Sequence, residues 1–188
     1  MPDYQDALQL FLTWTEGESL RRHAYAVEAA MAEYARVLGE DEEKWRITGL
    51  LHDMDYEKHP TAEEHPFVGV SVLRSEGYPE DVIEAILGHA QYSGVPRTTR
   101  LAKTLFAVDE LAGFITAVAY VRPTGLEGMK PKSVKKKLKD KAFAAAVSRD
   151  DVYQGAEELG VDFDEHISRV IAGMAKAASR LGFEQVDG

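Results

Sequence analysis

Apolar residues recur along this chain at the three- and four-residue spacing of α-helices. One such stretch covers residues 20–38, and Gly39 follows it as an expected C-cap. Asp41 is expected to cap the next helix, and Pro79 to begin a later one. The same spacing predicts a long helix over residues 99–121.

The C-terminal third continues this pattern. Ser133 is expected to cap a short lysine-rich helix, and two further helices are predicted near residues 150–159 and 163–181. The alternation typical of strands is essentially absent, and the breaks between helices are short. The pattern therefore predicts an all-α fold, a single-domain helical bundle over residues 1–188.

Composition narrows the class of protein. With 188 residues, 45% of them apolar, the chain suits one globular domain with a substantial core. Its net charge of −10 disfavours non-specific binding of duplex nucleic acid, which usually requires a basic protein. The absence of cysteine excludes disulfides, thiolate metal sites and a cysteine nucleophile. An acidic N-terminus and the lack of long apolar runs predict a soluble, cytoplasmic protein with no membrane partner.

Several polar side chains fall at helix positions that should face the core. His23 lies three residues after Leu20, and His89 lies three residues after Ile86. Asp109 occupies a comparable inward position on the long helix. A carboxylate there is costly to bury unless it is paired or binds a metal.

The stretch GLLHDMDYEKHP, residues 49–60, places His52 and Asp53 side by side where an apolar run ends. Taken singly, an inward histidine is more often a hydrogen-bonded core residue than a metal ligand, and Asp109 could pair with an arginine. Taken together, these histidines and aspartates offer imidazole nitrogens and carboxylate oxygens. Such a set suits a divalent transition metal.

The ordered set His23, His52-Asp53 and Asp109 resembles the HD superfamily of metal-dependent phosphohydrolases. The contexts LRRHAYAV, TGLLHDMD and AVDELAGF carry this resemblance over about half the chain. It implies a bundle of the HD-domain type, with a metal-site core at about residues 18–121 and C-terminal helices over residues 130–182 packed on it. His52 and Asp53 would then be the catalytic doublet.

Two further histidines extend the resemblance to HD subfamilies that bind two metal ions. His65 in EEHPFVGVSVL and His89 in AILGHAQ stand where those subfamilies have extra histidines. Asp53 would bridge the ions, and His65 and His89 would serve the second one. The implied cofactor is one or two ions of Fe, Mn, Co, Ni or Zn, with Mg less suited to imidazole ligands. The ligands implied for the first ion are His23, His52, Asp53 and Asp109.

Other features set limits on the resemblance. His59 competes with His65 for its role but is expected to be exposed in a loop, and His166 lies far from the pattern. Many HD proteins have a lysine three residues after the doublet aspartate, where this chain has Tyr56. The tripeptide Gly77–Pro79 occurs in the cyclic-di-GMP phosphodiesterase branch after the late histidine, but here it precedes that histidine, so this branch is rejected.

A phosphate-binding site in an acidic protein needs local positive charge. Arg97, Arg100 and Lys103 follow His89 closely and are the first candidates. The run at residues 130–141 is the second: seven lysines and one aspartate give it +6, against −16 for the rest of the chain (−10 minus +6). For both groups the alternative is a solvated turn or helix face.

The implied function is hydrolysis of a phosphate ester of a nucleotide or related small molecule by metal-activated water. One alternative is a non-catalytic HD module that binds a metal or a nucleotide for regulation. Another is a structural helical adaptor whose histidines are satisfied in the core. The expected partner is a small phosphorylated substrate, and duplex nucleic acid is not expected to bind.

Overall fold

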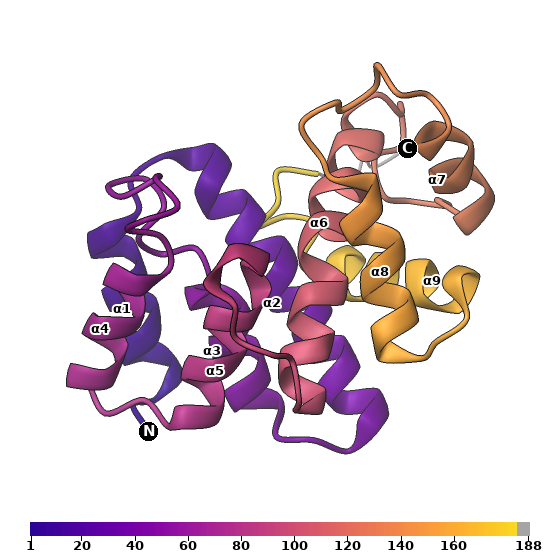
Figure 1. Cartoon of the computed structure of the whole chain (residues 1–188). Helices are drawn as coiled ribbons and strands as arrows, with labels where there is room; N and C mark the ends of the chain where they lie inside the picture. Colours follow the sequence, from indigo (N-terminus) through magenta and orange to yellow (C-terminus); the bar gives the residue numbers. More distant parts are fainter. Residues whose placement is uncertain (184–188) are drawn as a thin grey trace.

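The computed structural model describes residues 1–183, and within that range the chain is helical with no strand (Figure 1). A short 3-10 helix, η1 (Gln91–Ser93), lies between α5 and α6. The predicted all-α helical bundle is confirmed. The α-helices are α1 (Tyr4–Trp14), α2 (Glu18–Leu38), α3 (Glu42–Leu51), α4 (Phe67–Ser75), α5 (Glu80–His89), α6 (Arg100–Tyr120), α7 (Pro131–Leu138), α8 (Arg149–Leu159) and α9 (Phe163–Lys176).

Local sequence explains where several helices begin and end. Helix α2 ends where Gly39 adopts φ of 69°, a left-handed conformation that favours glycine. The side chain of Asp41 accepts a hydrogen bond from a backbone N–H in the first turn of α3. Thr99 and Ser148 cap α6 and α8 in the same way. The predicted C-cap of α2 at Gly39 and the predicted N-cap of α3 at Asp41 are therefore confirmed.

Three elements differ from the sequence predictions. Helix α7 begins at Pro131 rather than after a cap at Ser133, because a proline in the first turn lacks only an N–H that would have no partner within the helix. Helix α9 ends at Lys176, and turns follow it where the prediction continued the helix to residue 181. Helix α1, capped by the Asp3 side chain, was not among the predicted helices.

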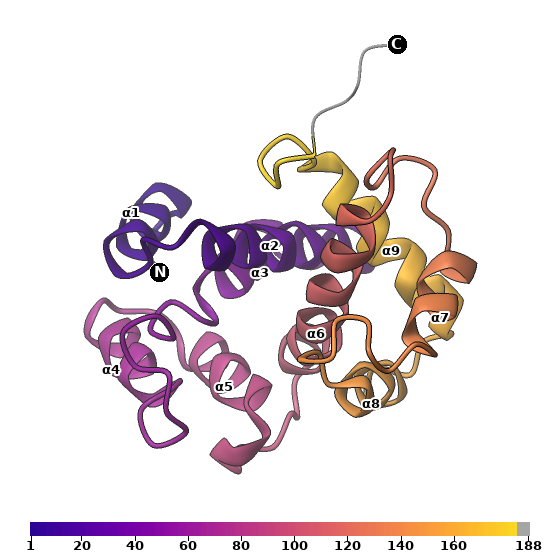
Figure 2. The same cartoon turned by 90° about the horizontal axis from the view of Figure 1, so that it is seen from above.

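Helices α2 and α6 form the centre of the molecule. Helix α2 packs against α3, α6 and α9, while α6 also packs against α5 and α8. Seen from above, α1, α3, α4 and α5 lie to one side of α6, and α7, α8 and α9 lie to the other (Figure 2). Buried apolar side chains such as Met31, Leu105 and Phe114 fill the space between them. Among residues 1–183, no helix combines the length and the apolarity needed to span a bilayer.

Candidate metal centre

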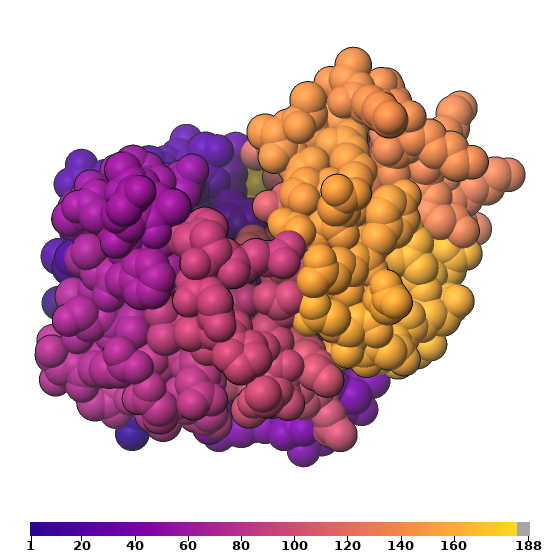
Figure 3. Space-filling view, in the orientation of Figure 1, coloured from indigo at the N-terminus to yellow at the C-terminus, as the bar shows by residue number. Residues whose placement is uncertain are grey.

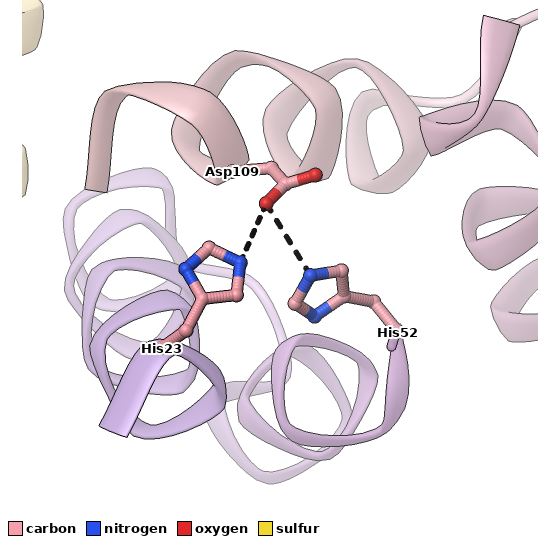
Figure 4. Close-up of side chains that lie close together, drawn as sticks. All are labelled: His23, His52 and Asp109. Atoms are coloured by element: carbon pink, nitrogen blue, oxygen red, sulfur yellow. Dashed lines mark hydrogen bonds and ion pairs between the residues drawn. The ribbon is translucent and has the colours of Figure 1, made fainter. Parts of the chain in front are cut away.

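Three helices bring a first group of polar side chains together (Figure 4). Nε2 of His23, on α2, lies 2.9 Å from Oδ1 of Asp109, on α6. Nε2 of His52, at the C-terminal end of α3, lies 3.3 Å from the same oxygen. One ligand atom from each of the three residues lies within 4.8 Å of the others. A single metal ion could therefore contact all three.

Asp53 stands between this group and a second one. Its Oδ2 lies 3.3 Å from Nε2 of His52 and 3.8 Å from Nε2 of His23. Its Oδ1 lies 3.2 Å from Nε2 of His65, which precedes α4, and 3.1 Å from Nε2 of His89, which ends α5. The two oxygens of one carboxylate thus face two different pairs of imidazoles, which is the arrangement required of a ligand that bridges two ions.

The protein fixes the outer nitrogen of two of these rings. Nδ1 of His52 lies 2.8 Å from the carbonyl oxygen of Gly49, and Nδ1 of His89 lies 2.5 Å from that of Ile86. A carbonyl only accepts hydrogen bonds, so each Nδ1 carries a proton, and Nε2 is the nitrogen that could give up its proton and offer a lone pair to a metal ion. Nε2 of His52 is buried and has no hydrogen-bond partner within the described part of the chain. This nitrogen and the nearby carboxylate oxygens could all be ligands of one cation lying between them.

His65 is oriented by a residue that the sequence analysis missed. Its Nδ1 lies 2.7 Å from Oδ1 of Asp55, whose other oxygen accepts a hydrogen bond from the backbone of Gly69 at 2.7 Å. Asp55 is only 1% exposed. A carboxylate on the far nitrogen of an imidazole is a common support for a metal-binding histidine. The available signal was a second aspartate two residues after Asp53.

The charges in this group shift the pKa values of its members. Burial alone would lower the pKa of His52, but the carboxylates of Asp53 and Asp109 outweigh it and hold the pKa well above the usual value. The same opposition raises the pKa of His65 to about 9, with Asp53 and Asp55 as its partners. Burial opposes the ionisation of Asp53, but the neighbouring imidazoles hold its pKa well below the usual range. A metal ion bound here would replace protons as the partner of these carboxylates.

The six candidate metal ligands are called the ligand group below: His23, His52, Asp53, His65, His89 and Asp109. This group opens into a cavity of about 450 Å³. Figure 3 shows the surface hollowed where the magenta part of the chain meets the orange part. Five of the six predicted ligands line this cavity and are accessible from it: His23, Asp53, His65, His89 and Asp109. The sixth, His52, is not among the lining residues. The remaining lining residues are Tyr56, Ala90, Gln91, Tyr92, Glu110, Gly113, Ala146, Val147 and Asp151.

Glu110 is a second acidic residue that the sequence analysis did not single out. It follows Asp109 on α6, and its Oε2 accepts a hydrogen bond from the backbone N–H of Ser148 at 3.0 Å. Burial raises the pKa of Glu110 to about 7, and the charge of Asp109 adds to the effect. Its carboxyl therefore links α6 to the start of α8.

The structure does not bring Arg97 to this cavity. Its guanidinium donates to both carboxylate oxygens of Glu158 at 2.7 Å and to the carbonyl oxygen of Gly88 at 2.8 Å. It also lies over the ring of Phe106. Arg97 thus holds α8 against the chain after α5, and its donors are engaged by protein groups.

The other predicted phosphate-binding cations also lie outside the cavity. Arg100 pairs with Glu40 at the surface, and Lys103 lines a separate cavity that also includes Arg97. The lysine run at residues 130–141 covers α7, where Lys135 pairs with Asp164. Among the described residues, no lysine or arginine lines the cavity at the ligand group.

Two histidines that the sequence analysis set aside lie outside the ligand group. Nδ1 of His59 lies 3.1 Å from Oε1 of Glu64 in the loop before α4. His166 is fully buried, with Nδ1 2.5 Å from the hydroxyl of Tyr34 and Nε2 2.9 Å from the carbonyl oxygen of Ala107. Burial lowers the pKa of His166 to about 4. Its two partners make it a satisfied core histidine.

Comparisons with known proteins agree with the position of this group. The model of the HD domain family matches residues 20–113, half of the chain. Among curated proteins, the chain is similar to Ribonuclease Y of Oleidesulfovibrio alaskensis and of Nitratidesulfovibrio vulgaris, with 30% identity over 97 residues in each case. That region is 51% of this chain but only 18% of either relative, so the chain matches less than a fifth of their length. No solved structure matches the chain.

Proposed function

The chain belongs to the HD domain family, a superfamily of metal-dependent phosphohydrolases, and we propose that it hydrolyses a small phosphate ester with the aid of bound divalent metal. The observation that carries this proposal is the carboxylate of Asp53. It is shared between His23 and His52 on one side and His65 and His89 on the other. An adaptor with a satisfied core would have no need of four imidazoles around one carboxylate.

In this proposal Asp53 takes part in both ion sites. When bound, divalent ions act as Lewis acids and generate a nucleophilic water near neutral pH. The chain's own contribution is to orient two of the ligand rings through the carbonyls of Gly49 and Ile86 and to keep the ring of His52, which is 1% exposed, away from bulk water. Imidazole ligands favour Fe, Mn, Co, Ni or Zn over Mg. The first ion would be held by His23, His52, Asp53 and Asp109, and the second by Asp53, His65 and His89.

The cavity supports a small substrate such as a nucleotide or a related phosphate ester. Its volume of about 450 Å³ lies within the range of small-molecule sites. Similarity to Ribonuclease Y makes RNA a second candidate. Strand-binding grooves carry positive charge along the phosphate backbone, whereas the described residues that line this cavity include neither lysine nor arginine. We therefore favour the small molecule.

A substrate panel tests this proposal. Purified protein is incubated with nucleotides, other phosphate esters and single-stranded RNA in the presence of Mn, Fe, Co, Ni, Zn or Mg. Metal-dependent release of phosphate from a small ester, abolished by a chelator and by Asp53→Ala, is the expected result. Asp150→Ala is the matched control, because Asp150 is exposed and lies outside the cavity.

Other outcomes of the panel separate the alternatives. Stoichiometric metal with no turnover of any compound would favour the non-catalytic regulatory module. Protein that binds none of the metals would instead indicate a structural helical adaptor. Cleavage of RNA alone would move the substrate to the class named by the curated relatives.

A further inference from the structure

One wall of the metal cavity is built outside the region that matches the HD domain. The match ends at residue 113, whereas Ala146, Val147 and Asp151 line the cavity from the chain before α8 and from its first turn. In Figure 3 the orange part of the chain, which includes this segment, borders the hollow. The substrate contacts that this wall can make therefore come from the C-terminal part of this chain.

Two contacts fix the wall relative to the metal ligands. Glu110, the residue after Asp109, accepts the hydrogen bond from the backbone of Ser148. On the other side, the side-chain amide of Gln91 donates to Oδ1 of Asp151 at 2.5 Å. Gln91 comes two residues after His89. Asp151 is thus tied to both sides of the ligand group.

Arg149 makes the segment before the wall rigid. Its guanidinium lies over the ring of Phe114, on α6, and donates to four backbone carbonyls of one short loop. Within that loop Ala144 has φ of 45°, a conformation that a non-glycine residue adopts only when its surroundings impose it. The wall is therefore pre-formed. The four carbonyls belong to Asp140, Phe143, Ala144 and Val147.

The charge of the cavity limits what can lie beside the reacting phosphate. Two divalent ions would balance the carboxylates of Asp53 and Asp109 together with the two negative charges of one phosphate monoester. The next groups along the wall are the carboxyls of Glu110 and Asp151, and the described lining contains no lysine or arginine. A second phosphate on the substrate would meet hydrogen-bond acceptors and no cation.

The same wall suits an organic group that carries N–H or O–H donors. Carboxylate oxygens accept such hydrogen bonds, and Asp151 has an oxygen beyond the one that Gln91 contacts. The rings of Tyr56 and Tyr92 line the cavity as well and are 41% and 54% exposed, so they are available to an aromatic or sugar face.

We propose that residues 146–151, together with Glu110, form a specificity wall that selects phosphate monoesters over di- and triphosphates. The preferred substrate has a single phosphate attached directly to an uncharged or cationic group that bears hydrogen-bond donors. Asp151 repels additional phosphates, Glu110 holds the wall through the backbone N–H of Ser148, and Arg149 is the positioning residue that keeps the wall in place. This inference rests on the proposed hydrolase function.

The test compares AMP, ADP and ATP, which share one organic group and differ in phosphate number. With the most active metal, kcat/KM of the wild type is expected to be at least about tenfold higher for AMP than for ATP, because the extra phosphates meet like charge. Asp151→Lys should shift that ratio toward ATP by about tenfold or more. Asp150→Lys places the same charge in the same turn of α8 but outside the cavity, and should change the ratio by about twofold at most.

A binding measurement and a milder variant provide a readout that does not depend on turnover. Orthophosphate and tripolyphosphate are titrated calorimetrically into metal-loaded wild type, Asp151→Asn and Asp150→Asn. Asp151→Asn should gain affinity for tripolyphosphate relative to orthophosphate, while Asp150→Asn should match the wild type. Equal shifts in the two variants, or wild type that prefers ATP to AMP, would overturn the specificity wall. Failure of every phosphate ester to react would instead contradict the hydrolase function on which the wall depends.

Discussion

Nδ1 of His65 lies 2.7 Å from Oδ1 of Asp55 in a buried pair that sits beside the candidate metal centre. The opposite nitrogen of the ring, Nε2, lies 3.2 Å from Oδ1 of Asp53. Asp55 thereby orients the ring of His65 so that Nε2 faces the carboxylate of Asp53. The proposed second ion site therefore depends on this pair.

Replacing Asp55 with asparagine should weaken metal binding at the second site. The loss of a carboxylate behind a ligand imidazole typically lowers metal affinity by about 10- to 100-fold. Elemental analysis after dialysis against limiting metal should show two ions per wild-type chain and close to one per Asp55→Asn chain. His59→Ala is the control, because His59 lies outside the ligand group. A variant that keeps two ions with unchanged affinity would show that Asp55 has no role in metal binding.

The helical spacing was sufficient to place the inward side chains. His23, His89 and Asp109 each stand one turn from apolar residues, and a helix turns side chains at that spacing to one face. In the structure the helices that carry them, α2 and α5, both pack against α6. Asp55 could not be assigned in this way, because it lies between α3 and α4, where no period relates side-chain direction to sequence.

Side-chain contacts between segments that are distant along the chain could not be predicted from the sequence. Closeness to His89 along the chain makes Arg97 a predicted phosphate-binding residue, yet the direction of its long side chain is decided by Glu158, 61 residues away. The wall that carries Asp151 likewise depends on a contact with Gln91, 60 residues away. Neither contact leaves a local pattern, because each joins segments that meet only in the folded chain.

Arg97→Ala is expected to destabilise the fold rather than to weaken substrate binding. The side chain is 10% exposed and forms a two-pronged pair with Glu158. Its removal leaves the carbonyl of Gly88 without this donor and leaves the partly buried carboxylate of Glu158 with Gln154 alone. The expected loss is about 2–4 kcal/mol in the free energy of unfolding by urea. The KM for the best substrate should remain that of the wild type.

Arg100→Ala is the matched comparison. Arg100 is 58% exposed in its pair with Glu40, and such surface pairs contribute about 1 kcal/mol or less. If either variant showed a raised KM with an unchanged unfolding midpoint, the replaced arginine would be a phosphate-binding residue after all.

His166 should make the protein less stable in mild acid. Burial lowers its pKa to about 4, below the ordinary 6.5, so between these values the unfolded chain binds a proton that the folded chain does not. The stabilising contribution is complete above pH 6.5 and is lost as the pH falls toward 4, by roughly 3 kcal/mol in total. His166→Gln should be less stable than the wild type at pH 7, and the gap should narrow as the pH falls. Unfolding in urea with chelator present, at half-unit steps, measures both slopes, and parallel slopes would contradict the assignment.

His89→Ala should separate the two ion sites. Nε2 of His89 approaches Oδ1 of Asp53, whereas the first group uses Oδ2, so the variant should retain one ion, held by His23, His52, Asp109 and Oδ2 of Asp53. Asp53→Ala should lose both. Isothermal titration with Mn or Zn distinguishes these stoichiometries, and loss of both ions in His89→Ala would indicate one shared site.

Anomalous diffraction from Mn-loaded crystals tests the bridging carboxylate most directly. Two peaks are expected on either side of Asp53, about 3.5–4 Å apart. One should be bounded by His23, His52 and Asp109, and the other by His65 and His89. A single fully occupied peak with His65 turned to solvent would contradict the two-ion centre, and the absence of any peak beside Asp53 would contradict the metal centre itself.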